Sequence, residues 1–242
     1  MNLLRTIRWL AYLTLYLIVT CPRALYCRHL RKKGQEEKAA AIVEQTVHRW
    51  AIRIIKAAGG EIIVEGAENI PDGTAVYIAN HQSDFDIPIV LGYLGKTHPI
   101  MAKKELAKVP GVHIWMTLID CIFLDRKDMK QSVQALMEAT RMVKGGKSLI
   151  IFPEGTRSKG GPAHEFKGGE FKVATRNKVP IVPITIDGSY TMFEQRMRIH
   201  PGTARVTIHP PIPTEGLTRE QQKALPQEVE RIVLAPLEDK TQ

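Results

Sequence analysis

Short apolar runs alternate with longer amphipathic segments along residues 60–242. Runs of four to six residues, bounded by glycine, proline or polar side chains, predict β-strands at 61–64, 74–79, 99–102, 121–124, 148–152, 181–186 and 204–209. Helical periodicity is clearest at 129–144 and 219–234. Strands that alternate with helices indicate an α/β fold. We therefore predict a single domain whose central mixed, largely parallel sheet is flanked by helices.

The N-terminal segment is more apolar than the rest of the chain. Residues 9–22 form an uncharged run of fourteen residues, mostly Leu, Tyr, Ile and Val. A membrane-spanning helix needs about 20 apolar residues for a hydrocarbon core of roughly 30 Å, whereas fourteen helical residues cover only about 21 Å. We therefore expect residues 1–22 to form a helix embedded in one leaflet, with a transmembrane anchor as the alternative.

The residues after this run argue against a cleaved signal peptide. The run ends in Cys21-Pro22-Arg23, which offers no small-x-small cleavage site. Further basic residues follow at once, namely Arg28, Arg31, Lys32 and Lys33. Such a flank is typical of a cytoplasmic segment that binds anionic lipid. The expected localisation is the cell membrane, on its cytoplasmic face, with the apolar helix as the anchor.

A second N-terminal helix is predicted at 36–58, where apolar residues recur every three or four positions with charges between them. Gly59 and Gly60 end it. Its apolar face would suit either the membrane surface or the protein core, and we expect it to pack against the core. These patterns divide the chain into membrane-associated helices at 1–59 and the α/β domain at 60–242.

Composition narrows the choice of partners. The chain has 34 basic and 25 acidic residues and a net charge of +9, which favours a membrane surface, an acidic carrier protein or nucleic acid. It contains no block that mixes aromatic and basic residues and no zinc-finger spacing, so we expect no nucleic-acid partner. The three cysteines and the scattered histidines lack metal-ligand spacing, and we predict no metal.

The first candidate site follows the strand predicted at 74–79. That strand runs directly into Asn80 and His81, and Asp86 follows five residues later. Ligands of open α/β sheets bind beyond the carboxyl ends of strands. An imidazole can take a proton from a hydroxyl, while a carboxylate holds the ring in one tautomer. We expect His81 in the loop and Asp86 in the next helix's first turn. The alternative is that Asp86 only caps that helix and His81 bonds a main-chain carbonyl.

A second candidate site follows the strand predicted at 148–152. Its polar turn contains Glu154, Gly155, Thr156 and Arg157. Glycine lets a ligand approach the main chain, and an arginine beside hydroxyls and amides suits bidentate binding of a phosphate. The alternative is a loop arginine paired with Glu154.

Four segments in order resemble the 1-acylglycerol-3-phosphate O-acyltransferase family of glycerolipid acyltransferases. They are NHQSDFD at 80–86, IFLDR at 122–126, FPEGTRS at 152–158 and VPIVP at 179–183. The first matches the family's N-H-x-x-x-x-D block, and the region from Ala75 to Ile186 is just under half of the chain. One departure is visible, because Asp120-Cys121 stands where the family often has glycine before the second block.

The resemblance implies catalysis by His81 as general base, oriented by Asp86. It also implies an acyl acceptor that carries a phosphate. The implied substrate-binding residues are Lys103, Arg126, Glu154, Gly155, Thr156 and Arg157. Lys103 fits the family's phosphate-binding lysine better than Lys104.

The implied reaction transfers a fatty acyl group from acyl-carrier-protein or acyl-CoA to the sn-2 hydroxyl of 1-acylglycerol 3-phosphate, giving phosphatidic acid. The thioester is a co-substrate, so no cofactor is expected. Two alternatives remain open. One is an acyltransferase of this family that uses glycerol 3-phosphate or another lysolipid, and the other is a membrane lipid-binding protein without catalysis.

Overall fold

The computed structural model describes residues 2–125 and 128–238. Its main sheet has five strands in the order β1-β7-β6-β2-β5. They are β1 (Gly60–Glu65), β7 (Gly202–Ile208), β6 (Ile181–Asp187), β2 (Val76–Ala79) and β5 (Leu149–Ile151). All neighbours are parallel except β6 and β7. This mixed, largely parallel sheet confirms the predicted fold class.

Two short strands extend the sheet beyond β5. β3 (Met101–Lys103) pairs in parallel with β4 (Ile122–Leu124). A single parallel bridge from Ile100 to Ile150 joins this pair to β5. Consequently the segments that carry the second and third sequence blocks lie on the same side of β2.

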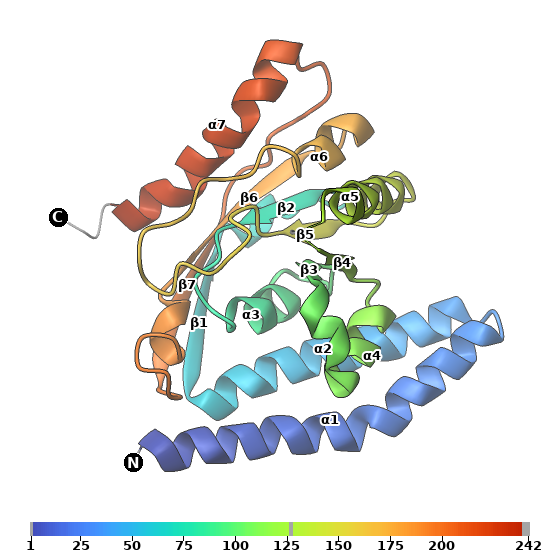
Figure 1. Cartoon of the computed structure of the whole chain (residues 1–242), viewed down its shortest axis with the longest axis vertical. Coiled ribbons are helices and arrows are strands. Elements are labelled where there is room, and N and C mark those ends of the chain that lie inside the picture. Colours follow the sequence, from blue (N-terminus) through green and yellow to red (C-terminus); the bar gives the residue numbers. More distant parts are fainter. Residues whose placement is uncertain (1, 126–127, 239–242) are drawn as a thin grey trace.

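Helices cover both faces of the sheet (Figure 1). One face holds α5 (Met129–Lys144), α6 (Lys172–Asn177) and α7 (Arg219–Glu238), and the other holds α1 (Asn2–Lys32), α2 (Glu36–Ala58), α3 (Asp86–Tyr93) and α4 (Pro110–Leu118). Along β2, Val76 and Ile78 pack in the core beneath α5, α6 and α7, whereas Tyr77 and Ala79 pack in the core beneath the other four helices. Because both faces of the sheet are buried, the sequences of its central strands are continuous apolar runs.

The first helix is longer than predicted. We expected it to end at Pro22, and that boundary is wrong, because α1 continues to Lys32 with Pro22 inside it. Beyond the proline, Ala24, Cys27 and Leu30 recur every three residues and are buried in the core. This packing stabilises the helix past the break that proline causes, and Figure 1 shows the helix bending along its length.

The other face of α1 exposes large apolar side chains to solvent. They include Leu4, Leu15, Ile18 and Val19, each at least 59% exposed. By length and composition, residues 3–32 could cross a membrane. An exposed apolar face of this kind indicates that α1 associates the protein with a membrane.

The second helix has the predicted bounds, Glu36–Ala58. Gly59 ends it with a φ of 80°, a left-handed conformation that glycine adopts without strain. Its buried side chains recur every three or four positions and belong to the same core as those of α1 and β6. The stripe read from the sequence is therefore a core face.

The departure at Asp120 has a structural explanation. Asp120 has a φ of 58°, the left-handed region that favours glycine and that aspartate tolerates better than most residues. Its carboxylate pairs with Arg31 at 2.9 Å and with Lys147 at 2.7 Å. Arg31 also donates to the carbonyl of Leu118 at 2.6 Å, at the end of α4. The aspartate therefore joins the end of α1 to the α4–β4 turn.

Replacing Arg31 with methionine tests this anchor. The variant leaves the carbonyl of Leu118 without its Arg31 donor and removes an ion pair of Asp120, which should cost about 1–3 kcal/mol of unfolding free energy. The melting temperature in detergent micelles should fall by about 2–4 °C for each kcal/mol lost. Arg28→Met, at an exposed position of α1, is the control and should change it little. Equal melting temperatures in the two variants would contradict the anchoring role.

Candidate active site

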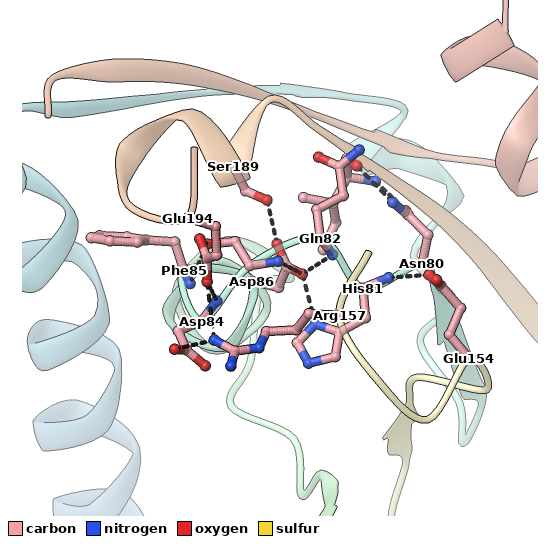
Figure 2. A network of polar contacts seen from close by, with 12 residues as sticks. Asn80, His81, Gln82, Asp84, Phe85, Asp86, Glu154, Arg157, Ser189 and Glu194 are labelled. Atoms are coloured by element: carbon pink, nitrogen blue, oxygen red, sulfur yellow. Dashed lines mark hydrogen bonds and ion pairs between the residues drawn. The ribbon is translucent and has the colours of Figure 1, made fainter. Parts of the chain in front are cut away.

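The candidate site lies at the carboxyl ends of three strands. His81 follows β2, Glu154 and Arg157 follow β5, and Ser189 follows β6 at the start of the short helix η3 (Ser189–Met192). Because β2 pairs in parallel with both β5 and β6, the three loops leave the same edge of the sheet. Figure 2 shows their side chains as one polar network.

His81 and Asp86 form a direct pair. Nδ1 of His81 lies 2.8 Å from Oδ2 of Asp86. The carboxylate is fully buried, whereas the histidine side chain is 16% exposed. The ring also lies against Phe152, with centroids 4.5 Å apart. A carboxylate at Nδ1 fixes the tautomer that carries its proton there and leaves the Nε2 lone pair free to accept one.

Three further donors hold the Asp86 carboxylate. The main-chain N–H groups of Gln82 and Ser83 donate to Oδ2 at 2.6 and 2.9 Å. The Ser189 hydroxyl donates to Oδ1 at 2.5 Å. Asp86 starts α3, as expected, but these contacts lead back to its own loop and across to η3. The alternative in which Asp86 caps α3 is therefore wrong, since no α3 amide within the described chain donates to it.

Glu154 joins two loops rather than pairing with Arg157. Its oxygens accept the main-chain N–H of His81 at 2.6 Å and that of His164 at 2.8 Å. Burial raises the pKa of Glu154, and the two amide hydrogen bonds oppose that rise. The carboxylate thus fixes the His81 loop against the loop that follows β5.

Arg157 pairs with two other carboxylates, and the interpretation as a partner of Glu154 is wrong. Its Nη1 lies 3.0 Å from Oε1 of Glu194 and also forms an ion pair with Asp84. Glu194 in addition accepts the Ser83 hydroxyl at 2.6 Å and the Asp84 N–H at 2.8 Å. Figure 2 shows Arg157, Asp84 and Glu194 beside the Asp86 cluster.

Gly155 and Thr156, which were predicted to bind substrate, lie in the turn after β5. Gly155 turns the chain with a φ of 76°, and its N–H donates to the carbonyl of Phe152 at 3.1 Å, so this amide is already hydrogen-bonded within the protein. Thr156 is exposed at the tip of that turn. Within the described chain, the N–H groups of Thr156 and Arg157 donate to no protein acceptor.

Two consecutive lysines, Lys103 and Lys104, lie where β3 ends. Lys103 ends β3 with an exposed side chain. Lys104 instead pairs with the buried carboxylate of Asp125, and this hydrogen bond raises the pKa of Lys104. Arg126, the neighbouring candidate, lies outside the described residues. In the described part of the chain, no group of three or more His, Cys, Asp or Glu residues is arranged to hold a metal ion.

An apolar cavity of about 700 Å³ reaches the polar network. Asp84 and Phe85 line it next to the catalytic candidates, and Met197 lines it from the loop after η3. The rest of the wall comes from α1, α2, α3, β3 and α4, with aromatic side chains that include Trp9, Trp50 and Trp115. Cys121 also lines it, and burial raises the pKa of this thiol to about 12, so it remains protonated.

Sequence reasoning missed three residues that hold the site. Ser189 and Glu194 act from the segment after β6, and Asn80 uses its amide to bond both the N–H and the carbonyl of Ile186 at 2.7 and 2.8 Å. Asn80 could have been singled out because it belongs to the first block. Ser189 and Glu194 lie outside all four blocks, and no local pattern identified them.

Comparisons with known proteins show which proteins this chain is similar to. A family model described as Acyltransferase matches residues 61–187. The 1-acyl-sn-glycerol-3-phosphate acyltransferase of Borreliella burgdorferi is 32% identical over 170 residues, which are 69% of this chain and 68% of that protein. The probable enzyme of the same name from Mycoplasma pneumoniae is 35% identical over 157 residues, which are 63% of this chain and 59% of that protein.

One solved structure is similar over nearly the whole chain. It is the crystal structure of the 1-acyl-sn-glycerophosphate (LPA) acyltransferase PlsC from Thermotoga maritima, with a TM-score of 0.85 and 33% identity. The match covers 99% of this chain and 96% of that one. Against the first curated relatives the chain covers about half of their length, for example 44% of the chloroplastic acyltransferase LPAT1 of Arabidopsis thaliana. The family match, the Borreliella relative and the shared fold together establish that this chain belongs to the acyltransferase family.

Proposed function

We propose that the protein is a 1-acylglycerol-3-phosphate O-acyltransferase that forms phosphatidic acid from lysophosphatidic acid and an acyl thioester. The observation that carries this proposal is the His81–Asp86 pair, which lies beside Arg157 in a polar network that an apolar cavity of about 700 Å³ reaches at Asp84 and Phe85. The pair supplies a base, the arginine a phosphate ligand, and the cavity a site for a hydrocarbon chain. The names of the relatives with known or probable activity support the same acceptor.

The proposed reaction is a direct transfer. Nε2 of His81 takes the proton of the sn-2 hydroxyl, and the oxygen attacks the thioester carbonyl carbon. The carbon–sulfur bond then breaks, and the imidazolium returns its proton to the leaving thiolate. Asp86 holds Nδ1 and stabilises the positive ring between these steps. No acyl-enzyme forms, because the acceptor oxygen is itself the nucleophile.

Three other sets of groups complete the proposed site. The N–H groups of Thr156 and Arg157 are available to stabilise the oxyanion of the tetrahedral intermediate. The Arg157 guanidinium, together with Lys103 and Arg126, would bind the acceptor's phosphate. Glu154 positions His81 and the turn at Gly155 through its two accepted hydrogen bonds.

The membrane supplies the acceptor in this proposal. The contacts that join α1 to the rest of the chain run along the helix, from the bond of Trp9 to the Ile54 carbonyl of α2 at 2.9 Å to the ion pair of Arg31 with Asp120. A helix held lengthwise in this way suits a position within one leaflet, with its exposed apolar face in the lipid. We place that leaflet on the cytoplasmic side, where basic flanks meet anionic lipid and where acyl-carrier-protein or acyl-CoA arrives from water.

Substitution of the catalytic pair tests the reaction. His81→Ala and Asp86→Asn should each lower acyl transfer to lysophosphatidic acid by about 10²- to 10⁴-fold. The assay measures phosphatidic acid formed by purified protein in mixed micelles, with acyl-carrier-protein and coenzyme A thioesters compared. His29→Ala, at an exposed position of α1, is the matched control and should keep parental activity. Acylation of another lysolipid, without acylation of lysophosphatidic acid, would mean that the proposed acceptor is wrong. Full activity of His81→Ala would contradict the mechanism.

Ser189 gives a second test that acts through Asp86. Ser189→Ala removes the donor to Oδ1, so the carboxylate holds the imidazole less firmly. We expect kcat to fall by about 10-fold with little change in KM, because one charge-assisted hydrogen bond is lost and the substrate contacts remain. Ser189→Thr keeps a hydroxyl and should recover most of kcat. An unchanged kcat in Ser189→Ala would show that the bond does not matter for turnover.

The cavity predicts the choice of acyl chain. Ala102→Leu places a larger side chain in the cavity wall and should lower kcat/KM for an eighteen-carbon donor by about 10-fold relative to a twelve-carbon donor. Ala67→Leu makes the same change at an exposed position outside the cavity and serves as the control. An equal loss for both donors would mean that the acyl chain binds elsewhere.

A further inference from the structure

Arg157 contacts two carboxylates that differ sharply in exposure. The Glu194 side chain is 1% exposed, whereas that of Asp84 is 65% exposed. The arginine itself is 27% exposed and can therefore meet a ligand from solvent. This asymmetry suggests that the two acidic partners have different roles.

Glu194 is built as a permanent partner. Besides Arg157, it accepts the Ser83 hydroxyl at 2.6 Å and the Asp84 N–H at 2.8 Å. A buried carboxylate separated from the cation that it pairs with would remain as an uncompensated charge, which is strongly unfavourable. Glu194 therefore keeps Nη1 of Arg157 in place whether or not a substrate is bound.

Asp84 is built as a partner that can leave. Its carboxylate is mostly in water, and an exposed ion pair contributes little stability. Water can solvate the carboxylate as soon as Arg157 releases it, so its departure leaves no unsatisfied group. Asp84 also lines the apolar cavity, and thus lies where an acceptor's hydrocarbon chain and phosphate would meet.

We propose that Asp84 is an exchangeable counter-ion of Arg157 that the acceptor's phosphate displaces, while Glu194 continues to position the arginine. This inference rests on the function proposed above. A guanidinium has five N–H donors in a planar fork, so Arg157 can keep its bond to Glu194 and still bind a phosphate. The arginine therefore has an anion beside it before and after the exchange, and Asp84 lowers the enzyme's affinity for phosphate-bearing acceptors.

The Asp84→Asn variant tests the exchange. Without the competing charge, KM for lysophosphatidic acid should fall by about 2- to 5-fold, the factor that corresponds to an exposed ion pair, while kcat stays within about 2-fold. The inhibition constant of inorganic phosphate, used as a competing probe, should fall by the same factor. Asp72→Asn removes the same charge from the exposed loop before β2 and should leave both constants unchanged.

An Arg157→Gln background separates contact from general repulsion. If Asp84 acts by occupying Arg157, then Asp84→Asn should have no effect once the arginine is absent. An equal fall of KM in that background would overturn the exchange in favour of simple repulsion between Asp84 and the phosphate. An unchanged or raised KM in Asp84→Asn alone would also overturn it, provided that the parent acylates lysophosphatidic acid. A parent without that activity would instead refute the proposed function.

Discussion

A buried carboxylate must be surrounded by hydrogen-bond donors, and the carboxylate of Asp86 places this demand on two segments, the loop after β2 and the start of η3. Two amide donors come from its own loop, one ring donor from His81 and one hydroxyl from Ser189 after β6. Moving either of these segments would leave a buried charge with an unmet acceptor, which costs several kcal/mol. The position of the His81 ring is therefore set by the hydrogen bonds that the buried Asp86 carboxylate requires.

The same requirement recurs at two other buried carboxylates, and together they hold the edge of the sheet. Glu154 joins the loops after β2 and β5, and Glu194 joins the loops after β2 and β6 while it also holds Arg157. Each bridges chain segments that the sheet already brings close, so the parallel strands set the coarse position and the carboxylates set the fine one. A site held by such contacts has its polar groups in place before a ligand binds, which suits the proposed transfer, because orienting the acceptor hydroxyl lowers the barrier.

The parts that sequence could predict are those governed by neighbouring residues. Periodicity gave the bounds of α2 and α5, and the break after β2 gave the pairing of His81 with Asp86. The end of α1 was not predictable, because a proline and a basic flank are ordinary stop signals, and only distant core contacts overrule them. Ser189 and Glu194 were missed for a related reason, since their partners Asp86 and Ser83 lie 103 and 111 residues away.

The packing of α1 gives the N-terminal helices a part in the site as well as in membrane attachment. Side chains of α1 line the cavity together with those of α3 and β3, while other residues of the same helix expose an apolar face. The core that contains α1 and α2 also contains β6 and β7, so these helices share their packing with the sheet that positions the loops. A lipid environment that stabilises the outer face of α1 therefore also stabilises one wall of the cavity. Under the proposed function, the cavity that would hold the acyl chain is complete only where the acceptor lipid resides, and membrane attachment and substrate binding depend on the same helix.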